Sequence, residues 1–328
     1  MVITGFADRL NEWGKKGIPF LFIADFELKK PVAFRLSEVD PNKILFDING
    51  FSNALYNPIL GRQPVVAKEI IQQSPIPPSE YQRKFDKVSY RLAYGESYLT
   101  NLTIETGIHL THSLHELFYL SKARYKLWYQ NEFLVFSPET FVQIRNEKIY
   151  SYPMKGTIDA TVSNAQEKIL HDRKELAEHV TIVDLIRNDL SQVATHVTVT
   201  RFRYIDELKT NNKTLLQVSS EIVGDLPESY SYCLGDILVS LLPAGSVSGA
   251  PKLKTVEIIR EVEGNDRGYY TGVFGYYDGK QLDAGVMIRY IERKDDQFIY
   301  RSGGGITTQS LAEAEYQEAI DKVYVPVD

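Results

Sequence analysis

The chain has 328 residues, 43% of them hydrophobic and 24% charged, which is the composition of a globular protein that buries its core without disulfides. Its net charge of -6 lacks the basic excess of nucleic-acid-binding proteins, so we expect no nucleic-acid partner. A single cysteine, Cys233, and six histidines without an H-E-x-x-H pattern argue against a disulfide framework and a typical zinc site, so any metal should have oxygen ligands.

The N-terminal region has strand-length apolar runs but no secretory or membrane signal. Charged residues appear by Asp8, which does not fit a signal peptide, and no apolar stretch approaches the roughly 18 residues of a membrane span. We therefore expect a cytoplasmic protein with no membrane partner. Residues 64–80 carry four prolines and indicate a surface connection, and a helix should follow over 80–95 with Ser79 as its N-cap. Strands are predicted at 18–26, 31–36 and 44–48.

The middle of the chain changes from strands to a helix. Residues 97–157 have a β pattern with a hairpin turn at Asn146–Glu147. A helix is predicted over 164–187, with one apolar face formed by Ile169, Leu176, Val180 and Val183.

The C-terminal part mixes both kinds of element. Because strands and helices do not alternate strictly, the pattern favours an α+β fold with antiparallel sheets over a doubly wound fold. Strands are predicted near 197–205, 214–224, 270–278, 281–292 and 297–302, and helices near 251–263 and 311–323.

One candidate pair is Glu139 in S-P-E and Lys155 in P-M-K-G-T, at the ends of two strands joined by the hairpin. A three-residue loop centred on Glu147 would place them opposite each other, whereas a two-residue loop would put them on opposite faces. An acid and an amine facing one cavity can serve as general acid and nucleophile. The alternative is an ion pair on the surface of the hairpin.

Acidic residues form a second candidate group. Glu315 and Glu318 share a helix face, where two like charges become favourable if a divalent cation lies between them and a third carboxylate. Glu178 is a candidate for that third ligand, because it aligns with the apolar residues Ile182 and Leu185 of its own helix. The alternative is a solvated acidic helix face.

Glycine-rich stretches form the third group. Residues 243–252 and 301–305 could bring backbone N–H groups close to an anion, with Lys252 and Arg289 binding carboxylates. The P-loop pattern is not satisfied between Gly245 and Lys252, so we do not expect a nucleoside triphosphate there. The alternative is that the glycines serve tight turns.

Taken in their order along the chain, the motifs of this sequence resemble those of the chorismate-binding enzyme family. That family includes aminodeoxychorismate, anthranilate, isochorismate and salicylate synthases. The agreement extends over about residues 95–323. We expect 1–95 to be a divergent part of the same fold and 96–328 to be the catalytic region, together one compact domain. The matching stretches are S-P-E (137–139), P-M-K-G-T (153–157), A-E-H-V-T-I-V-D-L-I-R-N-D-L (177–190), G-S-V-S-G-A-P-K (245–252), G-V-F-G-Y (272–276), D-A-G-V-M-I-R (283–289), G-G-G-I (303–306) and E-A-E-Y-Q-E-A-I-D-K-V (313–323).

The resemblance implies two large antiparallel β-sheets packed together and flanked by helices, with chorismate and Mg²⁺ in a cleft. Glu178 and Glu318 would be Mg²⁺ ligands with Glu315 beside them, and Glu139 the general acid/base. Gln217 departs from the histidine that many relatives carry at its place. The implied substrate-binding residues are Tyr276, Arg289, Lys252, Ser248, Gly249, Thr157, Gly303, Gly304 and Gly305.

Lys155 favours one branch of the family, because aminodeoxychorismate synthases resemble this chain in having lysine where the other synthases usually have alanine. The resemblance therefore implies production of 4-amino-4-deoxychorismate from chorismate and ammonia, for p-aminobenzoate and folate synthesis. Lys155 would attack C2 while Glu139 protonates the hydroxyl that leaves C4, and a metal charge and desolvation would lower the pKa of Lys155.

The source of ammonia should lie outside these residues. Cys233 lacks the glycine-flanked elbow of an amidotransferase nucleophile, so we expect free ammonia or a separate glutamine amidotransferase subunit. Two alternatives are an anthranilate synthase component I and a catalytically silent subunit that binds chorismate or a partner.

Overall fold

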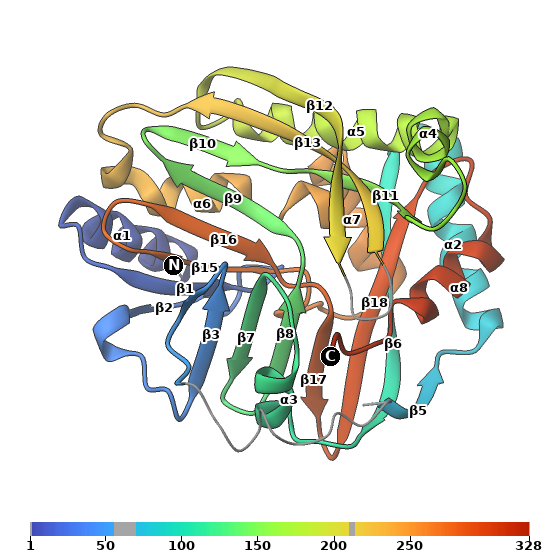
Figure 1. Ribbon diagram of the computed structural model, residues 1–328, viewed down its shortest axis with the longest axis horizontal. Helices are drawn as coiled ribbons and strands as arrows, with labels where there is room; N and C mark the ends of the chain where they lie inside the picture. Colours follow the sequence, from blue (N-terminus) through green and yellow to red (C-terminus); the bar gives the residue numbers. More distant parts are fainter. Residues whose placement is uncertain (1, 56–69, 210–213, 328) are drawn as a thin grey trace.

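The computed structural model describes residues 2–55, 70–209 and 214–327, which form two antiparallel β-sheets with helices around them (Figure 1). The predicted α+β fold is confirmed. Within the described residues each sheet has nine strands. The first sheet has the order β11 (Met154–Asp159), β13 (Thr214–Asp225), β10 (Lys148–Ser151), β9 (Thr140–Arg145), β16 (Leu282–Val286), β15 (Val273–Tyr277), β1 (Phe20–Ala24) and β2 (Val32–Arg35), with β12 (Thr195–Lys209) paired to β13.

The second sheet contains the remaining strands. Its central pair joins β6 to β18 over nine residues, from Phe298 opposite Ile108 to Ile306 opposite Thr100. The order is β14 (Gly249–Ala250), β6 (Leu99–Leu110), β18 (Gln297–Ile306), β17 (Tyr290–Lys294), β8 (Phe133–Ser137), β7 (Tyr125–Tyr129), β3 (Ile44–Ile48) and β4 (Phe51–Ser52), with β5 (Ile70–Pro75) paired to β6.

The strand β1 shows how the two sheets are held together. All five of its residues are buried. Because side chains alternate between the faces of a strand, Phe20 and Phe22 pack with the helices outside the first sheet, and Leu21 and Ile23 pack between the two sheets. The continuous apolar run that the sequence shows at 18–26 is therefore the signature of a strand that is covered on both faces.

Helices cover the outer faces of the sheets (Figure 1). The first sheet packs against α1, α5 and α6, while α2, α7 and α8 pack on β6 and β18. Within the described ranges, no helix has the length and apolar character needed to cross a membrane. The helices are α1 (Val2–Lys15), α2 (Pro78–Ala93), α3 (Leu114–Leu120), α4 (Ala165–His171), α5 (Arg173–Leu190), α6 (Leu234–Leu241), α7 (Lys252–Glu263) and α8 (Ala312–Asp321).

The helix predicted over 164–187 is two helices. Asp172 ends α4 and caps α5, because its carboxylate accepts a hydrogen bond from the backbone N–H of Glu175 at 2.9 Å. The predicted apolar face is wrong at two of its four residues: Ile169 and Val183 are buried, but Leu176 is 36% exposed and Val180 is 47% exposed. The buried face of α5 contains Glu178, Ile182, Val183 and Leu185, so it includes a carboxylate that a hydrophobic pattern leaves out.

Three further boundaries differ from the predictions. The helix α2 has Pro77, not Ser79, as its N-cap, because Pro78 already occupies the first turn. The expected surface connection over 64–80 contains β5, and its residues 64–69 lie outside the described residues. The single strand predicted over 281–292 is two strands, β16 in the first sheet and β17 in the second.

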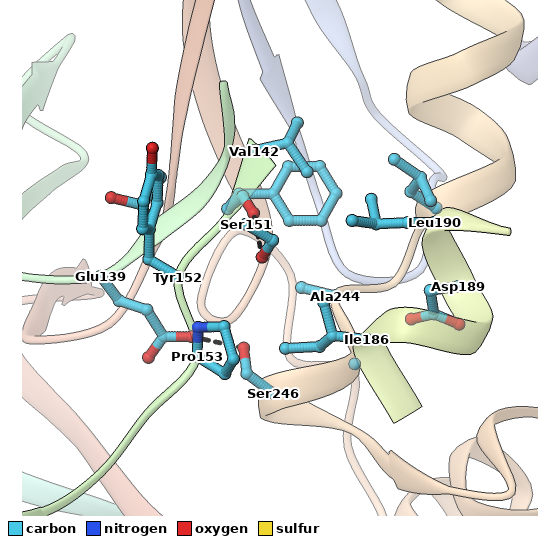
Figure 2. Close-up of a pocket in the computed structure, with 14 residues that line it drawn as sticks. Glu139, Val142, Ser151, Tyr152, Pro153, Ile186, Asp189, Leu190, Ala244 and Ser246 are labelled. Carbon is cyan, nitrogen blue, oxygen red and sulfur yellow. Dashed lines mark hydrogen bonds between the residues drawn. The ribbon is translucent and has the colours of Figure 1, made fainter. Parts of the chain in front are cut away.

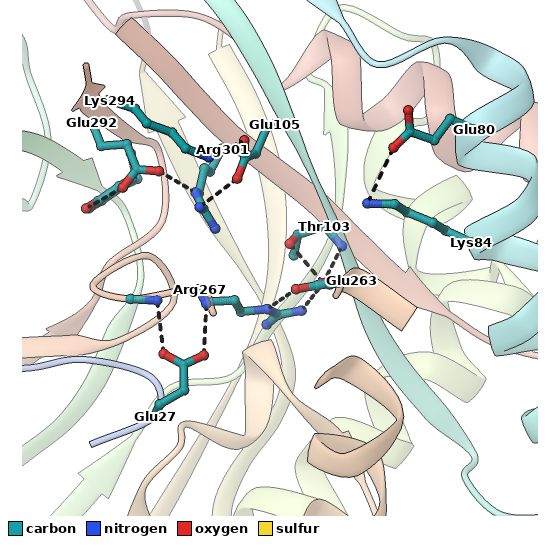
Figure 3. A network of polar contacts seen from close by, with 12 residues as sticks. Glu27, Glu80, Lys84, Thr103, Glu105, Glu263, Arg267, Glu292, Lys294 and Arg301 are labelled. Atoms are coloured by element: carbon teal, nitrogen blue, oxygen red, sulfur yellow. Dashed lines mark hydrogen bonds and ion pairs between the residues drawn. The ribbon is translucent and has the colours of Figure 1, made fainter. Parts of the chain in front are cut away.

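A buried arginine links several of these elements (Figure 3). The Arg267 side chain is 1% exposed, and its guanidinium pairs with the Glu263 carboxylate at 2.6 Å. It also donates to the carbonyl oxygens of Val247 and Asn101, each at 2.8 Å. The Glu27 carboxylate accepts from the backbone N–H of Arg267 at 2.8 Å. These bonds join β6, α7 and the segment before β14, and they satisfy a charge that would otherwise be costly to bury.

Replacing Arg267 by alanine should lower the free energy of unfolding by about 3–5 kcal/mol, because the buried Glu263 carboxylate loses its partner. The matched control is Arg293→Ala, since Arg293 and Asp296 form an exposed pair at 3.9 Å. That control should change the free energy of unfolding by less than about 1 kcal/mol. Urea unfolding followed by circular dichroism measures both, and equal losses in the two variants would contradict this account of Arg267.

Candidate active site

A cavity of about 780 Å³ lies where β11, β13, α5 and α8 approach the second sheet. This is within the usual size of a small-molecule site. Both basic and acidic side chains line this cavity. An anionic ligand could therefore bind to several cations there, although the surface of the cavity is not uniformly basic. The charged side chains at its walls are Lys122, Arg124, Lys155, Arg289 and Lys322, and Glu139, Glu175, Glu178, Asp206, Glu315 and Glu318.

Lys155 and Glu178 form an ion pair in the wall of this cavity. The Lys155 Nζ lies 2.6 Å from Glu178 Oε2, and the Glu178 side chain is 6% exposed. Burial is the largest single influence on the pKa of Lys155 and would lower it, but the Glu178 carboxylate and two further glutamates outweigh burial. The pKa of Lys155 is therefore raised above its ordinary value. The expected lowering of this pKa is not found in the protein alone.

Glu139 lies between β8 and β9 and shares the cavity with Lys155. The Ser246 hydroxyl donates a hydrogen bond to Glu139 Oε1 (Figure 2). Burial raises the pKa of the Glu139 carboxyl, although Ser246, Arg289 and Lys322 oppose the shift. A carboxyl that keeps its proton more readily than usual is suited to act as a general acid. Because Ser246 donates to Oε1, that proton belongs on the other oxygen.

The hairpin that precedes Lys155 has a two-residue turn. Asn146 and Glu147 have φ angles of 51° and 58°, and Arg145 pairs with Lys148. This register would put Glu139 and Lys155 on opposite faces of a regular hairpin. Both nevertheless line the cavity, because β10 ends at Ser151 and β11 pairs with β13, with an irregular register between Met154 and Thr157.

The acidic residues of α8 face the same cavity. Glu315 is 5% exposed, and a methyl group added at Gly304 would lie 3.4 Å from Glu315 Oε2 and 3.7 Å from Glu318 Oε1. Gly304 thus leaves space beside both carboxylates. Lys322 Nζ pairs with Glu318 Oε1 at 2.6 Å and donates to the Gly303 carbonyl at 2.8 Å. Burial lowers the pKa of Lys322, although Glu318 opposes that shift.

The donor chemistry of these carboxylates suits Mg²⁺, which prefers oxygen ligands. Glu178 and Glu315 are buried carboxylates, and such groups need a positive partner. Across the three described ranges, however, no group of three acidic, histidine or cysteine side chains is gathered closely enough to hold a metal. Instead, the ammonium groups of Lys155 and Lys322 lie against Glu178 and Glu318. A cation would have to take over these two pairings.

Several predicted substrate-binding residues also reach the cavity. Arg289, Thr157 and Gly305 line it, as does Gln217, whose role the sequence left open. The Arg289 guanidinium lies 5.3 Å from the ring centroid of Tyr324. An arginine and backbone N–H groups in one wall can bind a carboxylate.

Six predicted substrate-binding residues do not line this cavity. Two of them, Gly303 and Gly304, lie beside its charged residues Lys322 and Glu315, whereas the other four are engaged elsewhere. Lys252 Nζ instead pairs with Asp189 Oδ2 at 2.7 Å. Tyr276 stacks on Phe51 with ring centroids 4.1 Å apart. The remaining two belong to the backbone turn before α7: the Ser248 hydroxyl donates to the Ala244 carbonyl at 2.9 Å, and any side chain at Gly249 would collide with the Leu99 carbonyl.

Sequence reasoning missed Lys322, Ser246 and Arg124. Lys322 follows Glu318 by four residues, so helix periodicity could have placed both on one face. Ser246 is inside the glycine-rich stretch 243–252, where only Ser248 was singled out. Arg124 follows α3, a helix that the sequence analysis did not predict, and no pattern pointed to it.

Comparison with known proteins points to one family. The family model for chorismate binding enzymes matches residues 41–328. A Haemophilus influenzae protein named "Uncharacterized PabA-like protein" is 48% identical over 323 residues, which are 98% of this chain and 97% of that protein. Anthranilate synthase component 1 of Archaeoglobus fulgidus is 38% identical over 57% of this chain and 45% of its own length. Aminodeoxychorismate synthase component 1 of Bacillus subtilis is 27% identical over 76% of this chain and 55% of its own length.

Solved structures share the fold. Anthranilate synthase component I from Streptococcus pneumoniae superposes with a TM-score of 0.70 at 20% identity, over 93% of this chain and 79% of that one. The menaquinone-specific isochorismate synthase MenF from Escherichia coli superposes with a TM-score of 0.69 at 16% identity, over 97% of this chain and 80% of that one. At these identities the likeness extends to the architecture alone.

Replacing Lys252 by methionine should lower the free energy of unfolding by about 3–5 kcal/mol, because the Asp189 carboxylate, whose side chain is 8% exposed, loses its partner. The double variant Lys252→Met/Asp189→Leu should recover most of this loss, since it removes both charges. Urea unfolding of the three proteins measures the effect. A Lys252→Met variant with unchanged stability but weakened substrate binding would show that Lys252 is a ligand-binding residue.

Proposed function

The chain belongs to the family of chorismate-binding enzymes, and we propose that it is an aminodeoxychorismate synthase component I. It would replace the C4 hydroxyl of chorismate with an amino group derived from ammonia. The observation that carries this proposal is the Lys155 side chain, which lines the same cavity as the acid Glu139. A nucleophile and a proton donor that face one substrate are what this displacement requires.

Chorismate carries two carboxylates, and the cavity offers separated cations for them. Arg289 precedes β17, Lys322 follows α8, and Arg124 follows α3. Because an arginine can bind a carboxylate through two parallel hydrogen bonds, Arg289 and Arg124 are the stronger candidates. The acidic residues would then hold the Mg²⁺ that we propose as the cofactor.

Mg²⁺ would be held by Glu178 and Glu318 with Glu315 beside them. When bound, it would neutralise these carboxylates and bind the ring carboxylate of the substrate, stabilising charge that develops in the transition state. Glu178 is the strongest of the charges that raise the pKa of Lys155. If Mg²⁺ held the Glu178 carboxylate, burial would be the dominant influence on the pKa of Lys155. Burial would then favour the neutral amine that attack requires.

The reaction consists of two successive displacements, after which Lys155 and Glu139 return to their starting states. The Lys155 amine forms a bond to C2, both ring double bonds shift by one position, and the C4–O bond breaks as Glu139 delivers its proton to form water. Ammonia then bonds to C4, the shift reverses, and the C2–N bond breaks to release Lys155. The proton lost by the new amine returns to the Glu139 carboxylate, so the acid of the first step is the base of the second.

Ammonia would come from a separate glutamine amidotransferase subunit or from solution. Cys233 is poorly suited to be a glutaminase nucleophile, because burial raises the pKa of its thiol and its Sγ donates to the Tyr230 carbonyl at 3.4 Å. It also lies outside the cavity that holds Lys155. We propose the cytoplasm as the location, because chorismate and ammonia are both water-soluble small molecules.

An anthranilate synthase component I is the second candidate, because the matched part of the Archaeoglobus fulgidus enzyme has the higher identity, 38% against 27% for the Bacillus subtilis aminodeoxychorismate synthase. Lys155 is the feature that favours amination at C4. The two candidates differ in their product, so one assay separates them.

Purified protein with chorismate, Mg²⁺ and ammonium at mildly alkaline pH should yield aminodeoxychorismate, detected by mass spectrometry and by p-aminobenzoate formation after a lyase is added. Lys155→Ala should lose this product or divert addition to C2, whereas the control Lys148→Ala, an exposed lysine, should retain it. Anthranilate or isochorismate from the unaltered protein, or an unchanged product from Lys155→Ala, would contradict the proposal.

Glu318→Gln should weaken Mg²⁺ binding by about tenfold or more, because the site loses one charged oxygen ligand. Isothermal titration calorimetry with MgCl₂ measures this effect without turnover. The matched control is Glu313→Gln, an exposed carboxylate on the same helix that does not line the cavity. Equal Mg²⁺ affinities in both variants would show that the metal is held elsewhere.

A further inference from the structure

A second, much smaller cavity lies behind Glu139 (Figure 2). Its volume is about 30 Å³, which is room for one or two molecules the size of water. Figure 2 shows Glu139 and Ser246 on one side of this space and Asp189 and Leu190 on the other. The ring of a chorismate-like substrate could not enter it.

The walls of the small cavity are mostly apolar, with polar groups at its two ends. Val142 is 2% exposed and Ala244 is 1% exposed, so both are deep in the protein. The Ser246 hydroxyl donates to Glu139, which leaves its oxygen free to accept a hydrogen bond. The charge of Asp189 is compensated by Lys252. The space therefore suits a small neutral hydrogen-bond donor better than an ion.

Glu139 is the single residue, among those the structure describes, that lines both this cavity and the large one. Glu139 is thus a wall residue of both spaces, with Ser246 bonded to its carboxylate from the side of the small one. In the proposed reaction this same carboxyl receives the proton from the added amine. A molecule held behind Glu139 is thus next to the group that must accept its proton.

We propose that the small cavity is the site at which ammonia is held before it adds to the substrate. This inference rests on the proposed function and names the position from which its second substrate acts. Ammonia fits in the space, is neutral, and can donate a hydrogen bond to the hydroxyl oxygen of Ser246 at one end or to the Asp189 carboxylate at the other. The large cavity would meanwhile be occupied by chorismate.

Two variants that fill the cavity test this assignment, Val142→Ile and Ala244→Val. Each should raise the KM for ammonia about five- to tenfold, because the added methyl groups compete for the space. The KM for chorismate should stay within about twofold, since no wall of the large cavity changes. Val88→Ile, on the buried face of α2, is the control for added bulk and should change neither value.

A variant that enlarges the cavity should gain a preference, and a folding defect would not produce such a gain. Val142→Ala enlarges the cavity and should increase the use of methylamine relative to ammonia by about tenfold, the effect of accommodating one more carbon atom. The N-methylated product is identified by mass spectrometry. Melting temperatures of all variants show that each remains folded.

The outcomes separate this inference from the proposed function. If the unaltered protein aminates chorismate but the filled variants keep their KM for ammonia, or if both KM values rise together, the cavity holds a structural water and the inference is overturned. A methylamine preference that does not change in Val142→Ala has the same meaning. If the unaltered protein releases no aminated product, the proposed function fails and this inference fails with it.

Discussion

Charge buried in the wall of the cavity must be paired, and this constraint organises the site. The Lys155 ammonium and the Glu178 carboxylate lie 2.6 Å apart, and the Glu178 side chain is almost inaccessible to solvent. Neither group would be tolerated there alone, because an uncompensated charge in such a position is costly. The second lysine–glutamate pair, Lys322 and Glu318, has the same 2.6 Å separation, but the Glu318 side chain is 49% exposed. The protein alone therefore pairs the buried Glu178 carboxylate with its own lysine, and in the proposed reaction Mg²⁺ and the substrate would exchange these partners.

The fold provides this arrangement by joining segments that are distant in sequence. Lys155 comes from an edge strand of the first sheet, Glu178 from the helix α5, and Glu318 from α8, which packs on β18 of the second sheet. The glycines of β18 permit the approach, since Gly303 fits against the backbone of β6 and Gly304 leaves space beside the α8 carboxylates. Behind the cavity, Arg267 and Lys252 hold the turn before α7 in place, so the residue that contacts Glu139, Ser246, comes from a rigid support.

The sequence predicted the fold class, because apolar runs of strand length indicated most strands. The motifs also singled out Glu139, Lys155, Glu178, Glu315 and Glu318, which line one cavity. The features that the sequence did not predict depend on contacts between residues far apart in the chain. The chain crosses between sheets near Arg289, whose φ is 52°, and no periodicity signals such a crossing. Lys252 and Tyr276 carry suitable chemistry but are engaged by Asp189 and Phe51, partners that lie far away in sequence.

The central claim is that Lys155 forms a bond to the substrate, and the most direct measurement is the mass of the protein quenched in acid after mixing with chorismate and Mg²⁺ without ammonia. The account predicts an increase equal to chorismate less one water, located on the peptide that contains Lys155 and removed when ammonia is added before the quench. An unmodified protein under conditions in which ammonia gives full turnover would contradict the covalent route.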